Sequence, residues 1–531
     1  MKRSFAILPL LLLGSQFHAQ DLGDRRLVLQ EITIPGMPGI QSFAWGQHEG
    51  EWLLLGGRTD GLHRRQPFAA FLAEDNNTTA YVVNATTGQV WNAPMATLPV
   101  GLFEQLQCTN MEYEQRGNTL YIIGGYGFSP TANDHITHSK LTAVDVPGAI
   151  TAIKTGGSLA PHFRQISDAR MAVTGGYLGL LNDEFYLIGG QRFMGRYNPM
   201  GPDFGPGFVQ EYTNAIRRFR IADDGTSLSL IDFVETVDTA NLHRRDYNLV
   251  YQIFPGGATG FTAFSGVFQY DVDLPWLNSV DITSEGYTVV PDFEQLLNQY
   301  HTAHLPAWSA TQASMSTVFF GGIGQYYFDG NGQLWNDENV PFVNTISRVR
   351  RASDGGMSEV AIGSMPALLG AGAEFIIEHD VPQLEGGILD LDALSGDTVV
   401  AGHIVGGITS SAANIFFVNT GTQSDASTRV FRVLLVRDIT TGTSEPTRTA
   451  APLRAWTGDA DQLVVETNVA EAGLAEMVLL DSSGRQVRTL FAARMPAGTQ
   501  RLHSPAKDLA AGRYVVELRI NGQRWTTNYV R

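Results

Sequence analysis

Short apolar runs that end in two glycines recur along the chain. The runs EWLLLGG, LYIIGG, FYLIGG, VFFGG and HIVGG share this form. Their glycine pairs are Gly56-Gly57, Gly124-Gly125, Gly189-Gly190, Gly321-Gly322 and Gly406-Gly407. In the widest gap, the run TAFSG carries Ser265-Gly266 in the place of a pair. Because the runs are rich in β-branched and aromatic residues, they predict strands that each end in glycine.

Each of these strands belongs to a longer repeating unit. An earlier candidate strand and a turn precede most runs, as in NMEYEQRGNTLYIIGG, and a further strand pair follows, as in NAIRRFRIADDGTSLSLIDFVE. Each unit is therefore expected to be a four-stranded antiparallel meander. A series of such units at long spacing is typical of a β-propeller. Glycine suits the strand ends because it allows a positive φ and the close approach of two backbones.

The repeat resembles that of kelch propellers, in which a glycine pair follows the second strand and a Tyr and a Trp come later. Tyr81 and Trp91 match these positions in the first unit, whereas the other units lose the Trp. The likeness implies an all-β, kelch-like β-propeller over residues 21–438. The first strand, Leu27–Ile34, is expected to close the ring beside RVFRVLLVRD.

The number of units is predicted from the positions of their first strands. Six units are expected, with first strands near residues 43, 110, 171, 248, 309 and 372. Seven units are the alternative, because TGGSLAPHF and LEGGIL contain further glycine pairs. A second alternative is a pair of stacked β-sandwiches.

The N-terminal residues predict export. MKRSFAILPLLLLGSQFHAQ has Lys2 and Arg3, then the apolar run Phe5–Leu13, and then a polar stretch that ends in Ala19-Gln20. This order of charged, apolar and small residues is that of a secretory signal, so residues 1–20 are predicted to be a signal peptide. No later segment has the roughly 18 uninterrupted apolar residues of a membrane-spanning helix, so none is expected in the mature chain.

The C-terminal residues predict a second, smaller domain. Residues 439–451 are rich in Thr and lack apolar periodicity, so we expect a linker there. Residues 452–531 contain four candidate strand segments, and the turn at Asn521-Gly522 is a strong hairpin signal. A small β-sandwich is expected.

The C-terminal segment resembles the sorting domain of the Bacteroidetes type IX secretion system. The matching features are LVV, then LLDSSGRQV, and then LAAGRYVVELRINGQ near the chain end. The Pro-Asn-Pro that opens the family's domain is replaced here by AAPLRAW. The resemblance implies a partner, the type IX secretion machinery, and a destination, the medium or the outer cell surface.

Composition excludes some classes of protein. The 531 residues carry a formal net charge of −17, with a pI near 5.1. Nucleic-acid binding needs a basic surface, so no nucleic-acid partner is expected. Cys108 is the only cysteine, which excludes an intrachain disulfide and a cysteine zinc site. No motif for a metal or a cofactor is present, and none is predicted.

Candidate ligand-binding residues are expected at the mouth of the propeller. Loops that enter the first strands meet there, and loops at such openings commonly carry function. The residues before these strands are His162, Arg164, Asp168, Arg170, His243, Arg244, Arg245, Asp246, Tyr300, His301 and His304. Two other units place Gln107, Cys108, Asn110 and Glu374 near this position. Arg, His and Asp would suit an anionic or sugar ligand, whereas the structural alternative is that they tie neighbouring units together.

The chain is therefore predicted to be a secreted or cell-surface propeller that binds an extracellular carbohydrate or protein without catalysing a reaction. The alternative is an extracellular glycan-active hydrolase, lyase or oxidase that uses the same mouth, and a purely structural surface protein is a third hypothesis. Copper-radical oxidases of the galactose oxidase type have similar propellers, and Cys108 and Tyr300-His301 resemble parts of their site. The Tyr that would crosslink to the cysteine is missing, since Met171 or Ala172 stands at its place.

Overall fold

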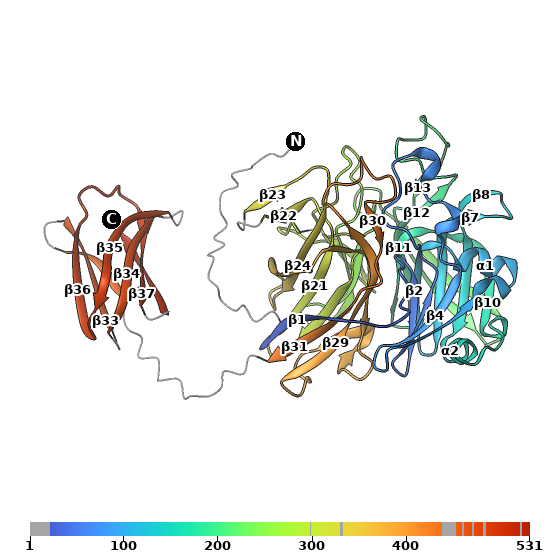
Figure 1. The fold of residues 1–531 in the computed structure, drawn as a ribbon, viewed down its shortest axis with the longest axis horizontal. Helices are drawn as coiled ribbons and strands as arrows, with labels where there is room; N and C mark the ends of the chain where they lie inside the picture. Colours follow the sequence, from blue (N-terminus) through green and yellow to red (C-terminus); the bar gives the residue numbers. More distant parts are fainter. Residues whose placement is uncertain are drawn as a thin grey trace. The chain divides into compact units, whose positions relative to one another are not determined.

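A computed structural model describes residues 22–297, 299–329, 333–437, 453–458, 461–469, 472–481, 485–520 and 523–531. These residues fall into two compact units, one up to residue 437 and one from residue 453 (Figure 1). The predicted signal peptide (1–20) and linker (439–451) lie outside the described residues, so they stay predictions.

The first unit is all-β and propeller-like, built from successive four-stranded antiparallel groups. The first group is β2 (Ala44–His48), β3 (Glu51–Leu55), β4 (Thr79–Asn84) and β5 (Gln89–Pro94). The second is β6 (Thr109–Arg116), β7 (Thr119–Ser129), β9 (Ser139–Asp145) and β10 (Phe163–Ala172). The third is β11 (Thr174–Leu181), β12 (Glu184–Met194), β14 (Ala215–Asp223) and β15 (Leu228–Val237). Short strands β8 (Asp134–Thr137) and β13 (Val209–Tyr212) pair with β12, and β8 thereby joins the second and third groups.

The chain continues in the same way through its second half. The fourth group is β16 (Asn248–Ile253), β17 (Thr259–Phe264), β18 (Val280–Thr283) and β19 (Gly286–Val289). The fifth is β20 (His304–Ser309), β21 (Ser314–Ile323), β24 (Phe342–Arg351) and β25 (Met357–Ser364), with β27 (Gln383–Leu384) and β28 (Ile388–Asp390) beside β20. The last is β26 (Leu368–Ile377), β29 (Thr398–Ser410), β31 (Val430–Arg437) and β1 (Arg25–Ile32), with β30 (Ser424–Ala426) on β29. The hairpin β22 (Tyr326–Phe328) and β23 (Leu334–Asn336) is inserted after β21.

The two ends of the first unit meet in one sheet. Strand β1 pairs antiparallel with β31 over its whole length, from Arg25 opposite Arg437 to Ile32 opposite Val430. The sequence predicted this pairing. Successive contacts run from β2 through β6, β11, β16 and β20 to β26, and residues of all six strands line one central space.

The glycine pairs bring neighbouring groups into contact. Both residues of each pair have a positive φ, as in Gly124 (63°) and Gly125 (88°). The amide of Gly125 donates to the carbonyl oxygen of Val173 at 2.9 Å, and a Cβ atom on Gly124 would lie 1.9 Å from that oxygen. Only glycine fits such an approach. Ser265 (60°) and Gly266 (100°) have the same conformation, so Ser265-Gly266 does replace a pair.

The two additional glycine pairs have other roles. Gly156 is the left-handed residue that ends helix α2 (Val146–Thr155), which is a common function of glycine. Gly386 and Gly387 lie in the short helix η5 (Glu385–Gly387) between β27 and β28. Neither pair follows the second strand of a four-stranded group.

The helices are short. Besides α2 and η5, the described residues contain α1 (Val100–Leu106), η1 (Pro67–Ala69), η2 (Ala73–Asp75), η3 (Met95–Thr97) and η4 (Ala160–His162). None of these helices has both the length and the apolar composition needed to cross a membrane.

The second unit has two antiparallel sheets. One contains β32 (Arg454–Gly458), β33 (Gln462–Val469) and β36 (Gly498–Pro505). The other contains β35 (Gln486–Met495), β34 (Gly473–Asp481), β37 (Arg513–Ile520) and β38 (Gln523–Val530). Both sheets contribute to one hydrophobic cluster, with Leu463 from the first and Met477 and Val516 from the second.

Candidate functional site

Six residues with left-handed backbone conformation surround the centre of the first unit. They stand at or just before the innermost strands, one in each four-stranded group: Ser42, Asn110, Gly175, Asp246, His301 and Gly372. Main-chain hydrogen bonds join several of them, from Ser42 to Gly372, from Asn110 to Ser42, from Asp246 to Gly175 and from Gly372 to His301, at 2.7–3.1 Å. We call these six residues the ring. Four of them are not glycine, although this conformation costs a residue with a side chain about 1 kcal/mol.

The side chain of Asn110 spans the ring. Its Nδ2 atom donates to Asp246 Oδ1 at 3.1 Å and lies 3.3 Å from His301 Nδ1. A single amide nitrogen carries two protons, so it can serve both partners. With the amide so oriented, Nδ1 of His301 accepts and its ring proton sits on Nε2. Burial lowers the pKa of His301, which keeps the ring neutral at pH 7.

The ring separates two spaces. On one side is a cavity of about 850 Å³, and on the other is a channel of about 160 Å³. Ser42, Asn110, Gly175, Asp246 and His301 line both spaces. The cavity has the size of typical small-molecule sites, and the channel does not.

Aromatic side chains form much of the cavity wall. His63 lies 4.8 Å from Tyr197, and Phe71 and Phe193 lie 5.3 and 5.2 Å from Tyr126, measured between ring centroids. These residues follow the glycine pairs of the first, second and third groups. The wall therefore combines connections that are far apart in the sequence.

Arg245 is held in place at the cavity. Its Nε atom donates to the hydroxyl of Tyr212 at 3.0 Å, Nη1 pairs with Asp246, and the guanidinium lies 5.2 Å from the ring of Phe268. The ring of Tyr212 stacks on His243 at 3.8 Å. Nη2 of Arg245 has no partner among the described residues and is available to a ligand.

His243 lies between two phenol rings. Tyr212 covers one face, and Tyr270 covers the other at 3.9 Å between centroids. Nδ1 of His243 lies 2.8 Å from Oδ1 of Asn214. Burial, with a smaller effect from the charge of Arg245, lowers the pKa of His243 to about 4. The three rings thus form a neutral, fixed stack at the cavity at pH 7.

Two other arginines, Arg58 and Arg65, line the cavity, and they differ in how many of their guanidinium N–H groups are already hydrogen-bonded. Arg58 is saturated, because Nε and Nη2 donate to Asp60 at 2.7 and 2.9 Å and Nη1 donates to Asn76 and to a carbonyl oxygen. Arg65 donates through Nη1 to the carbonyl of Pro199, and its guanidinium lies over Phe416. Arg65 has no carboxylate partner in the part of the chain that the structure describes. Arg65 and Arg245 are therefore the cations that can contact a ligand.

The channel below the ring is lined with carboxyl groups. Glu112, which is 2% exposed, accepts from the amide of Gly176 at 2.8 Å, and Glu114 accepts from the hydroxyl of Tyr251 at 3.0 Å. Glu374 lines the same channel together with Tyr113. Burial raises the pKa of each of these three glutamates to about 8, so all are mostly protonated at pH 7.

The structure brings five of the predicted site residues to the cavity: His243, Arg245, Asp246, Tyr300 and His301. His304 lines the channel instead, with Nδ1 3.0 Å from the carbonyl oxygen of Thr302. Arg244 is buried and donates to the carbonyl oxygens of Ser265 and Asn278 at 2.6 and 3.1 Å. Arg244 has the structural role, not the ligand-binding one.

The predicted residues His162, Arg164, Asp168 and Arg170 do not line the cavity. They lie in η4 and β10, the outer strand of the second group, and Val173 alone connects β10 to β11. Arg164 pairs with Asp223 of the third group at 2.6 Å, which joins two groups. The prediction assigned these residues to a loop, whereas Arg164, Asp168 and Arg170 lie in the fourth strand of the meander.

Sequence reasoning missed most of the wall. The missed residues are those that follow the glycine pairs, among them Arg58, His63, Arg65, Phe71, Tyr126, Phe193, Tyr197, Tyr212, Phe268, Tyr270 and Phe416. The feature of the sequence that could have identified them is the segment after each glycine pair, which varies in length and is often long. Long connections within compact domains are frequently functional.

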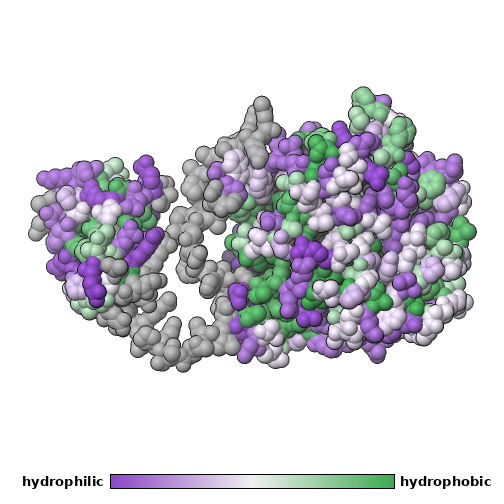
Figure 2. All heavy atoms as spheres, viewed as in Figure 1, coloured by the Kyte–Doolittle hydropathy of each residue, from purple (hydrophilic) through white to green (hydrophobic). Residues whose placement is uncertain are grey.

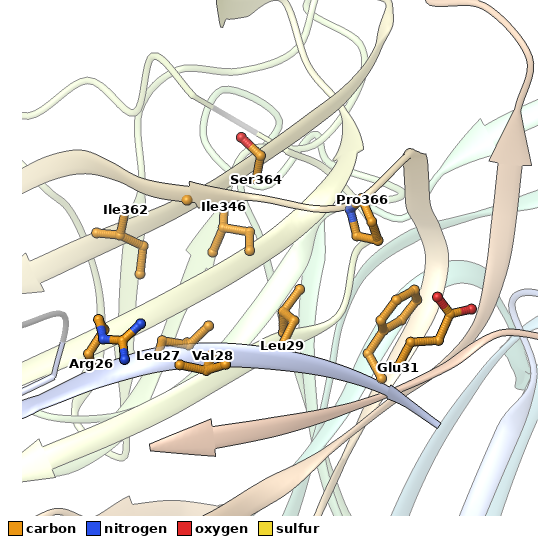
Figure 3. A pocket seen from close by; sticks show the side chains of 11 residues that line it. Arg26, Leu27, Val28, Leu29, Glu31, Ile346, Ile362, Ser364 and Pro366 are labelled. Atoms are coloured by element: carbon orange, nitrogen blue, oxygen red, sulfur yellow. The ribbon is translucent and has the colours of Figure 1, made fainter. Parts of the chain in front are cut away.

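A second hollow lies away from the ring. Figure 3 shows it between β1, with Leu27 and Leu29, and the strands that carry Ile346 and Ile362. Its volume is about 390 Å³, and Arg26 and Glu31 flank the apolar side chains. It lacks a convergent set of polar groups, so the cavity at the ring is the better candidate site.

No model of a known protein family matches the chain, and no curated protein matches it. Among solved structures, that of YjhT is similar to this chain, with a TM-score of 0.39 and 11% sequence identity. The similarity covers 76% of this chain and 99% of that one.

Proposed function

We propose that the first unit is a kelch-like β-propeller of six blades that binds a carbohydrate in the cavity above the ring, without catalysing a reaction. The observation that carries this proposal is the combination of fixed aromatic faces with N–H groups of Arg65 and Arg245 that have no hydrogen-bond partner among the described residues. Sugar rings present apolar faces to aromatic side chains and hydroxyl or carboxylate oxygens to hydrogen-bond donors. Tyr212, His243 and Tyr270 supply the stack, and Arg65 and Arg245 supply the donors.

A glycan array with the purified full-length protein tests this function. Binding to a defined set of glycans is expected, and Arg245→Ala should weaken it at least about tenfold, since a charge-assisted hydrogen bond contributes about 1.5–3 kcal/mol. Arg220→Ala is the matched control, because Arg220 is an exposed arginine on β14. Its Nη1 atom lies 3.7 Å from Oδ2 of Asp232. Binding to proteins but not to glycans would instead favour a protein ligand. The absence of glycan binding would refute the proposal.

A glycan-active enzyme is the second candidate. The cluster of Asn110, Asp246 and His301 favours it, because three polar side chains occupy backbone positions that ordinarily suit glycine. Strained residues of this kind cluster at active sites. A neutral His301 with its proton on Nε2 can donate a hydrogen bond to an oxygen on which negative charge develops in a transition state. Product analysis after incubation with the glycans that bind would detect turnover, and His301→Ala should abolish it.

We also propose that the chain is exported and sorted. The residues that resemble a secretory signal and a type IX sorting domain support this, and the second unit is compact by itself, as a separate sorting domain would be. Removing residues 439–531 in a bacterium with a type IX system should retain the protein inside the outer membrane. Normal surface exposure or release of the truncated protein would refute the sorting role.

A further inference from the structure

The cavity is closed at its floor. The side chain of Asn110 crosses the ring to Asp246 and His301, and the ring residues are joined by main-chain hydrogen bonds. Beyond the ring, the channel offers only about 160 Å³ and is lined by Glu and Tyr side chains, among them the hydrogen-bonded pair Glu114 and Tyr251. A ligand must therefore enter and leave through the open end, and a long polymer cannot pass through.

The open end carries exposed aromatic side chains. Among the described residues of the first unit, the exposed Phe, Tyr and Trp side chains are Phe68, Phe204, Tyr270 and Phe417, which are 69, 70, 56 and 60% exposed. Each is on a connection whose other residues line the cavity. We call these four residues the rim. Figure 2 shows apolar surface on the protruding tip at the upper right, where Figure 1 draws the connection before β13.

Two rim residues continue the cavity wall outward. Tyr270 is the outer ring of the stack with His243, and its hydroxyl donates to the carbonyl of Thr239 at 2.6 Å. Phe417 packs edge-on against Phe416 at 5.0 Å, with Arg65 over its ring at 5.3 Å. Both rings are thus held in place while more than half exposed. A fixed, exposed aromatic ring loses little conformational entropy when a ligand stacks on it.

The connections that carry the rim are tied to one another. Nη1 of Arg196 donates to the carbonyl of Phe68 at 2.8 Å, and Arg65 donates to the carbonyl of Pro199. Nδ2 of Asn419 donates to the carbonyls of Leu62 and His63 at 2.6 and 3.0 Å. The rim is therefore a continuation of the cavity wall and not a set of independent loops.

We propose that the site recognises the end of an oligosaccharide chain: the terminal units enter the closed cavity, and the following units stack on Tyr270 and Phe417. This inference rests on the proposed carbohydrate binding and specifies its ligand class. A closed cavity next to an open aromatic platform suits a chain that is longer than the cavity and has a free end. A groove open at both ends would be needed for internal segments.

The test uses ladders of linear oligosaccharides of one to six units, each immobilised once through its reducing end and once through its non-reducing end. The purified full-length protein should bind one orientation of a ladder and lose binding when that free end is blocked. Affinity should rise with length beyond the units that the cavity holds. Phe417→Ala should reduce the gain for longer chains by about two- to tenfold. Tyr270→Ala should reduce the same gain and also weaken binding of the shortest member, because Tyr270 belongs to the binding stack with Tyr212 and His243.

Trp456→Ala is the matched control, because Trp456 is an exposed aromatic residue of the other unit. It should leave every affinity unchanged. Glycan binding that is equal in both orientations, or insensitive to blocking the end, would overturn chain-end recognition and leave the proposed carbohydrate binding intact. Length dependence that survives both rim substitutions would overturn the role of the rim. Binding to no ladder at all would refute the proposed function itself.

Discussion

Replacing Glu112 by Gln tests the electrostatics of the channel below the ring. Glu112 is 2% exposed, one carboxylate oxygen accepts from the amide of Gly176, and Oε2 has no partner among the described residues. Gln has nearly the same shape, and its amide oxygen can keep the bond to Gly176. The substitution therefore removes the ionisable group while leaving the packing in place.

The magnitude follows from the pKa of Glu112, which burial raises from 4.5 to about 8. Between these values the unfolded chain loses a proton that the folded chain keeps, so the free energy of unfolding falls as pH rises. The slope is about 1.4 kcal/mol per pH unit, and the accumulated loss is about 3 kcal/mol at pH 7. Above pH 8 the loss is complete, and below pH 4.5 it is absent. Glu112→Gln should abolish this contribution.

Calorimetry of the full-length protein from pH 5 to pH 8 measures the effect. For a unit of about 400 residues the unfolding entropy corresponds to a shift of about 1 °C per kcal/mol, so Glu112→Gln should raise the Tm of the first unit by about 3 °C at pH 7. The shift should shrink toward zero as the pH approaches 4.5. Glu49→Gln is the control, because that side chain is 82% exposed, and it should change nothing.

The result that refutes this reasoning is equally specific. If Glu112→Gln lowers the Tm by the same amount at pH 5 and pH 8, then the carboxylate is ionised in the folded protein and is paired there with a group or an ion. If the Tm does not change at any pH, then burial does not perturb Glu112.

Three further predictions concern the fold and the site. Gly124→Ala should destabilise the first unit by several kcal/mol, because its Cβ would overlap a main-chain oxygen, whereas Gly207→Ala, where nothing lies within 4 Å, should cost little in a thermal unfolding assay. Deleting residues 22–32 removes β1 and leaves the edge of β31 without a partner strand, so the protein should aggregate. Light scattering would detect the aggregates, and a monodisperse, folded product would contradict the closing role of β1. Tyr212→Phe removes the hydroxyl that holds Arg245 and should weaken glycan binding about threefold to tenfold by calorimetric titration. The Tm should fall only slightly, because the same hydroxyl also bonds to the main chain at Val267 and Phe268. Unchanged affinity would mean that Asp246 alone positions the guanidinium.

The strand order of the first unit was largely predictable because its signals are local. A β-rich run followed by two glycines marks the second strand of a meander wherever the backbone meets its neighbour, and the contact between Gly125 and Val173 gives the reason. The pairing of β1 with β31 was predictable because the first strand precedes a first group that is complete without it, so it was free to complete the last group. The place of Arg164 in an outer strand was not, because a loop and a strand of similar composition look alike in sequence.

The candidate site was predictable only in part. His243, Arg245 and His301 were found because they precede first strands, whereas Tyr212 and Phe71 lie in connections whose course no local pattern describes. Two residues that are adjacent in the sequence can also differ completely in burial and in role. Arg244 points into the protein and Arg245 lines the cavity, and the left-handed turn at the next residue accompanies this difference.

By itself, the amino-acid sequence determined the class of fold, the repeated strands, the glycine pairs and the closure by the N-terminal strand. These depend on hydrophobic periodicity and on backbone conformation, which neighbouring residues express. Only the tertiary structure decided which polar and aromatic side chains share the cavity, and that Asn110 closes its floor against Asp246 and His301. Those residues are 136 and 191 positions away from Asn110, and only the closed arrangement of the strands brings them within hydrogen-bond distance.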